Sequence, residues 1–160
     1  MNIKVVDFEI LSRHYVKYQD GILEIEKVKQ DFVKRLDPLK KEMQDLLKLS
    51  ISGDENTQKL NGERFQELQE QGMMIDEEFK YKMREMNDIL SKNIYSDLEN
   101  LISEWSVENS VDMVIASTEV VYLNSNYYVT NDIIQILKDK DLYIDLVKEE
   151  TKAQVIEPTV

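Results

Sequence analysis

The chain has 160 residues, of which 32% are charged and 42% hydrophobic, with a net charge of −12 and no cysteine. This composition is typical of long, exposed helices with a thin core, and a thin core favours oligomerisation. It excludes a disulfide framework and a thiolate metal site. Nucleic acid and anionic lipid are not expected as partners because Lys and Arg form no basic block. No run of about 18 apolar residues occurs, so no membrane span is predicted.

The N-terminal segment 3–7, IKVVD, is a short β-prone run. The stretch from Phe8 to Tyr18 is predicted to be helical up to a break at Asp20-Gly21, because glycine is a strong local breaker.

A long helical stripe begins at residue 22. Its apolar residues recur at intervals of three or four, close to a seven-residue repeat, which is typical of a helix packed along a partner. They are Ile22, Ile25, Val28, Phe32, Leu36, Leu39, Met43 and Leu46. Pro38 interrupts this stripe and predicts a kink near residues 34–38.

Residues 49–58, LSISGDENTQ, form a turn signal, and a second stripe follows to about residue 107. Its apolar face contains Phe65, Leu68, Gly72, Ile75, Phe79, Met83, Met86, Leu90, Ile94, Leu98, Ile102 and Trp105. Because one short turn joins the two stripes, residues 22–107 predict a long antiparallel helical hairpin with its tip near residues 50–57. At 1.5 Å per residue the 22–49 arm alone is roughly 40 Å long, so the hairpin is expected to project.

The two arms differ in charge. Residues 22–49 carry 7 Lys and Arg against 6 Asp and Glu, whereas residues 57–107 carry 6 against 11. One hypothesis is that the first arm offers a basic face to partners, through Lys27, Lys29, Lys34, Arg35, Lys40 and Lys41. The simpler interpretation is a solvated surface with salt bridges within each helix.

Residues 111–116 and 119–123 are predicted to be two further strands. Thr130 is a good N-cap for a helix that starts at Asn131, with Val129 and Ile134 at the two staple positions. The predicted fold class is therefore α+β. One N-terminal and two C-terminal strands make a small body from residues 1–21 and 108–138, and residues 139–160 form a C-terminal extension. A short extra helix is expected there around Leu142, Ile144, Leu146 and Val147.

These ends resemble those of the Skp/OmpH family, trimeric periplasmic chaperones with a β body and long helical tentacles. The resemblance rests on IKVVD, on VDMVI at 111–115, on VVY at 120–122 and on VTNDII at 129–134. It implies a homotrimer whose copies complete each other's β body. The residues expected in that contact are Ile3, Val5, Met113, Val114, Ile115, Val120, Val121 and Tyr122.

The chain departs from the family in three respects. It is strongly acidic whereas the best-known members are basic, its first residues, MNIKVVDFEI, lack an export signal, and residues 139–160 run past the usual end. The resemblance implies the periplasm, and the cytoplasm is the alternative.

Apolar residues off the stripes near the tip are the predicted client-binding surface. They are Leu47, Leu49, Ile51, Leu60, Met73 and Met74. Methionine is flexible and polarisable, so it adapts to many apolar partners. The predicted function is an ATP-independent holdase that binds unfolded proteins of the outer-membrane type between the arms of a trimer. The alternative is a non-enzymatic structural or assembly protein of the same fold, cytosolic and virus-encoded.

No enzymatic activity, cofactor or metal is expected. His14 is the only histidine and has no cysteine to share a metal with. Asp76, Glu77 and Glu78 are adjacent on a helix, where neighbouring side chains do not face one another. A solvated surface is the expected role of this acidic triplet.

Overall fold

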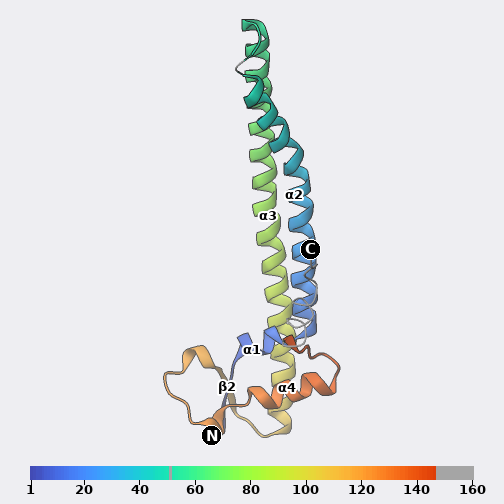
Figure 1. Ribbon diagram of the computed structural model, residues 1–160. Coiled ribbons are helices and arrows are strands. Elements are labelled where there is room, and N and C mark those ends of the chain that lie inside the picture. Colours follow the sequence, from blue (N-terminus) through green and yellow to red (C-terminus); the bar gives the residue numbers. More distant parts are fainter. Residues whose placement is uncertain (51, 147–160) are drawn as a thin grey trace, which may run out of the picture. The chain divides into compact units, whose positions relative to one another are not determined.

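The computed structural model describes residues 1–50 and 52–146. Its elements in chain order are β1 (Ile3–Val6), α1 (Phe8–Arg13), α2 (Val16–Leu49), α3 (Glu55–Glu108), β2 (Met113–Ala116), two 3-10 turns (Ser117–Glu119 and Ser125–Tyr127) and α4 (Thr130–Asp139). Long helices thus accompany a small parallel sheet, which makes the fold α+β (Figure 1). The chain divides into two compact units. The first contains residues 1–22 and the chain from residue 89, and the second contains residues 23–88.

The sheet of the first unit joins the two ends of the chain. β1 and β2 are parallel, in a register that pairs Ile3 with Met113 and Val6 with Ala116. On the other edge of β1, the Val5 carbonyl accepts a hydrogen bond from the Val129 amide at 2.9 Å, and Val5 forms a bridge with Tyr128. Both edges of β1 are therefore occupied within its own chain.

The predicted strand at 119–123 is wrong, and the sheet has two strands among the described residues rather than the predicted three. Residues 117–119 form a 3-10 turn instead, and Val121 and Tyr122 are exposed to 107% and 84%. The β-branched and aromatic residues gave the segment its strand propensity, but such propensity depends on the packing and pairing that the fold provides. The second edge of β1 is taken by residues 128–129, and residues 119–123 add no strand to the sheet.

The core of the first unit combines side chains from all its helices and from β1. Its fully buried members are Val6, Leu11, Tyr15, Leu98, Ile133 and Leu137. The Tyr15 hydroxyl donates a hydrogen bond to the Asp97 carboxylate at 2.8 Å. Burial, followed by this bond and by the charge of Asp97, raises the pKa of Tyr15. Tyr15 thus fixes α3 to the beginning of α2.

The predicted helix break at Asp20-Gly21 is also wrong. The break lies at His14 and Tyr15, and α2 continues through Gly21. A Cβ atom on Gly21 would lie 2.3 Å from Leu90 Cδ1, so the glycine allows α2 and α3 to approach closely in the first unit.

Two smaller predictions, the extra helix near residues 142–147 and the N-cap at Thr130, differ from the structure. Residues 142–144 lie against residues 14–16, since the Val16 amide donates to the Leu142 carbonyl and the Ile144 amide donates to the His14 carbonyl, each at 2.9 Å. Residues 142–144 form no helix, but Leu146 is helical, and Val147 lies outside the described residues. Thr130 belongs to α4 and does not cap it, because its hydroxyl accepts a hydrogen bond from the Asp7 amide at 2.9 Å.

In the second unit the predicted apolar stripes are confirmed as the contact between α2 and α3. Ile25, Phe32 and Leu68 are buried, and every other stripe residue within 23–88 is half-buried. Phe32 and Phe79 meet edge to face with ring centroids 5.1 Å apart. Pro38 lies within α2, which continues on both sides of it.

Candidate functional site

The second unit carries an open apolar groove between α2 and α3, and ion pairs between the two helices lie on either side of it. The Arg35 guanidinium lies 4.9 Å from the centroid of the Phe32 ring and donates two hydrogen bonds to Glu78, at 3.0 and 2.8 Å. The bidentate bond from Arg35 lowers the pKa of the Glu78 carboxyl. This pair covers one side of the Phe32–Phe79 contact.

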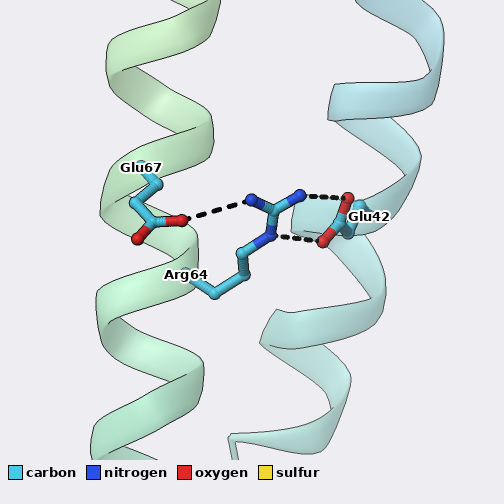
Figure 2. A network of polar contacts seen from close by, with 3 residues as sticks. All are labelled: Glu42, Arg64 and Glu67. Atoms are coloured by element: carbon cyan, nitrogen blue, oxygen red, sulfur yellow. Dashed lines mark hydrogen bonds and ion pairs between the residues drawn. The ribbon is translucent and has the colours of Figure 1, made fainter.

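A second pairing lies further along the same helices (Figure 2). Arg64 donates to both carboxylate oxygens of Glu42, at 2.7 and 3.2 Å, and to Glu67 on its own helix at 3.2 Å. The hydrogen bonds from Arg64 lower the pKa of Glu42, and the two carboxylates raise the pKa of Arg64. The guanidinium therefore bridges α2 and α3.

Between these two pairings lies an apolar groove with a volume of about 680 Å³. Its apolar lining comes from both helices and consists of Leu36, Leu39, Met43, Leu68 and Met73. Its rim carries Lys40, Glu70 and Asp76, together with Gln66 and Gln69.

Gly72 explains why the groove exists. It occupies a position of the α3 stripe where an apolar side chain is expected, and a Cβ atom built on it meets nothing within 4 Å. Close packing between helices depends on a side chain filling each such position. The missing side chain leaves Leu39 and Met43 partly uncovered.

A smaller hollow of about 220 Å³ lies nearer the C-terminal end of α2 and the N-terminal end of α3. It is lined by Leu46, Leu47 and Phe65, and by Gly62, whose added Cβ would also meet nothing within 4 Å. Both glycines of α3 thus lie beside apolar hollows.

The predicted client-binding residues are exposed wherever the structure describes them. The exposed fractions are 55% for Leu47, 52% for Leu49, 57% for Leu60, 64% for Met73 and 71% for Met74. Ile51 lies outside the described residues. Leu47 and Met73 line the two hollows, whereas Leu49, Leu60 and Met74 line neither.

The sequence interpretation missed the stripe residues that line the larger groove, Leu36, Leu39, Met43 and Leu68. It assigned them to the helix contact alone. The signal that identifies them is the glycine at a stripe position, Gly72, which the sequence interpretation included among the apolar residues of the stripe.

The residues predicted to hold copies together differ in exposure. Met113, Val121 and Tyr122 are exposed, whereas Val5 is 3% exposed and belongs to the interior of its own unit. Ile3, Val114, Ile115 and Val120 are half-buried. Only the exposed and half-buried ones can offer side-chain surface to a second copy.

His14 has a packing partner in the first unit. Its Nδ1 atom lies 3.0 Å from the Ile144 carbonyl oxygen, and its ring stacks on Tyr143 with centroids 5.2 Å apart. Within residues 1–50 and 52–146, no group of three or more His, Cys, Asp or Glu is placed to hold a metal ion. None of the helices in this part of the chain has the length and apolar content to cross a membrane.

No protein-family model matches the chain, and no curated protein matches it.

Proposed function

We propose that the chain is an ATP-independent holdase that shields apolar segments of unfolded proteins. The observation that carries this proposal is the apolar groove at Gly72, with Met73 and Met74 exposed beside it. Contiguous apolar surface with a polar rim is one mark of a protein-binding site.

The chemistry of the groove suits a client of varied sequence. Leucine and methionine line it, and thioether side chains adapt their shape to many apolar partners. The amides of Gln66 and Gln69 and the charges of Lys40, Glu70 and Asp76 lie at its rim, where a client's backbone needs polar partners. Such contacts are individually weak, so a client leaves when its own folding is more favourable.

The larger assembly of this proposal follows the Skp/OmpH resemblance. In it, α2 and α3 form a projecting antiparallel hairpin and three copies associate through the first unit, with Met113, Val121 and Tyr122 in contact. Clients are unfolded proteins of the outer-membrane type, and the compartment is the periplasm. The protein catalyses no reaction in this proposal.

A light-scattering assay tests the holdase function. Purified chain is added at equimolar and threefold ratios to an outer-membrane barrel protein diluted from urea, and scattering is followed at low and moderate salt. We expect suppression of aggregation by the natural sequence. Absence of suppression at both salt concentrations would remove the proposal.

Two substitutions localise the activity. Gly72→Leu fills the groove and is expected to weaken suppression. Gln71→Leu adds the same side chain at an exposed position outside the groove lining and should leave suppression intact. Equal activity of the two variants would place client binding elsewhere.

The second candidate is a non-enzymatic structural or assembly protein of the same fold in the cytosol. The net charge of −12 favours it, because electrostatic capture of acidic clients is then weak. This candidate predicts a stable oligomer that does not suppress aggregation in the same assay.

A further inference from the structure

Two stripes of opposite charge run along the second unit. Lysines recur every seven residues on α2, and glutamates recur every seven residues on α3. The lysine stripe is Lys27, Lys34, Lys41 and Lys48, and the glutamate stripe is Glu63, Glu70 and Glu77, all of them exposed. Seven residues of helix rise about 10.5 Å, so both stripes present charges at the same spacing.

Each stripe is centred on the side of its helix opposite the contact with the partner helix, and Glu70 also lines the rim of the groove. At about 100° per residue, Lys41 lies roughly 180° around α2 from Phe32, and Glu70 lies roughly 180° around α3 from Phe79. Phe32 and Phe79 meet at the contact between the helices. The lysine stripe and the glutamate stripe therefore lie on the two opposite outer sides of the paired helices, and no ion pair in the described chain joins one stripe to the other.

Few of these charges are neutralised within the chain. Lys27 pairs with Glu24 at 2.6 Å and Lys34 pairs with Asp31 at 3.9 Å, both on exposed surface where such pairs contribute little. In the part of the chain that the structure describes, Lys41, Lys48 and Glu63 take part in no ion pair. The next position of the glutamate stripe is Arg84, so the acidic surface ends at Glu77.

The two stripes are also level with each other along the helices. Phe32 contacts Phe79, and the Arg35–Glu78 pair shows that residue numbers rise on α2 as they fall on α3. Lys34, two residues beyond Phe32, is therefore level with Glu77, two residues before Phe79. By the same count Lys41 is level with Glu70, and Lys48 is level with Glu63.

We propose that the second unit binds the second unit of another copy, with the lysine stripe of one against the glutamate stripe of the next. When two copies stand side by side in the same orientation, each of the three glutamates meets a lysine at its own level. Met74 and Tyr81, exposed to 71% and 69%, flank the glutamate stripe and supply apolar area to the contact. Complementary charges of matched spacing mainly determine register and partner choice.

The contact joins two different surfaces, so it is heterologous. Two copies that meet through it leave one stripe free on each, whereas a closed ring of copies uses every stripe. The proposal concerns self-association alone and does not depend on the holdase function.

Cysteine cross-linking tests the contact directly because the chain contains no cysteine. Full-length Lys41→Cys and Glu70→Cys chains are prepared separately, mixed at low salt and oxidised. We expect a disulfide-linked heterodimer that forms several-fold faster than in the matched mixture of Lys41→Cys with Glu63→Cys, which lies one seven-residue step out of register. Equal rates in the two mixtures would overturn the proposal.

Salt and charge reversal provide an independent measurement. The cross-linking rate should fall at least about threefold in 1 M NaCl, where the Debye length is about 3 Å. Adding Lys34→Glu to the first chain should lower the rate, and adding Glu77→Lys to its partner should restore it. A cross-linking rate that does not change with salt, with Lys34→Glu or with Glu77→Lys would also overturn the proposal. Circular dichroism of each variant establishes that the helices are retained.

Discussion

The helices α2 and α3 pack against each other differently in the two units of the chain. In the first unit α2 and α3 approach so closely at Gly21 that a Cβ there would overlap the Leu90 side chain where it stands, and Leu98, Ile133 and Leu137 are completely buried. In the second unit the same two helices leave apolar hollows at Gly62 and Gly72, where a Cβ would meet nothing. Gly21 thus allows close packing of the two helices, whereas Gly62 and Gly72 leave apolar side chains beside them uncovered. Fully buried side chains are therefore concentrated in the first unit, whereas the described part of the second unit has only Leu68 among them and carries the open apolar hollows.

The largest expected effect is a cavity in the first unit. Leu98→Ala removes a fully buried side chain from the core and should lower the free energy of unfolding by about 2–5 kcal/mol. Leu39→Ala, at the half-buried edge of the groove, should cost clearly less because part of that side chain already contacts solvent. Urea denaturation followed by circular dichroism measures both. Equal costs would contradict the proposed difference between the units.

Substituting alanine for glycine should have opposite signs in the two units. Gly72→Ala should raise the free energy of unfolding by about 1 kcal/mol, because alanine favours helix and the added methyl group meets nothing. Gly21→Ala should lower it by about 1 kcal/mol or more, because overpacking against Leu90 outweighs the gain in helix propensity. Thermal and urea unfolding of the pair give the comparison. A stabilising Gly21→Ala would show that Leu90 moves aside without cost.

Tyr15 allows a test of the first unit alone. Tyr15→Phe removes the hydroxyl that donates to Asp97 and should lower the free energy of unfolding by about 1 kcal/mol. Because burial raises the pKa of Tyr15 in the folded chain, the unfolded chain loses this proton first as pH rises. The contribution of Tyr15 is therefore fully present below its ordinary pKa of 10.0 and is lost above it. In Tyr15→Phe this part of the loss should be absent, which urea midpoints measured between pH 8 and pH 11 will show.

Periodicity predicted the long helices, their apolar contact and the turn near residue 50, because these depend on local patterns of apolar residues. It also located β1 and β2. The break at His14 and Tyr15 has no local signal, since residues 8–20 contain neither Gly nor Pro. Burial of Tyr15 and the backbone bonds to residues 142–144 accompany that break, and both depend on chain segments far away in sequence.

The candidate site was predicted only in part, for a related reason. Exposed side chains such as Met73 and Met74 follow from their position off the stripe, and the sequence predicted them. The groove depends on the absence of a side chain at Gly72. An apolar repeat remains recognisable when one of its positions is glycine, and the repeat does not show the space that the glycine leaves. The false strand at 119–123 shows the converse, because its residues suit a strand but pair with no strand of the described chain.

The smallest expected effect concerns the ion pair that joins α2 and α3 in the second unit. Hydrogen bonds from Arg64 lower the pKa of Glu42, so the folded chain holds this carboxylate ionised to lower pH than the unfolded chain does. Its contribution to stability is present above the ordinary glutamate pKa of 4.5 and is lost as pH falls through the lowered value. Glu42→Gln should therefore weaken the acid dependence of unfolding, measured by urea titration between pH 3 and pH 6. Glu63→Gln, which removes an exposed carboxylate without an arginine partner, is the control and should leave that dependence nearly unchanged. If both variants follow the same pH profile, the Arg64 bridge contributes nothing in solution, and the packing of the two helices then depends on their apolar contact alone.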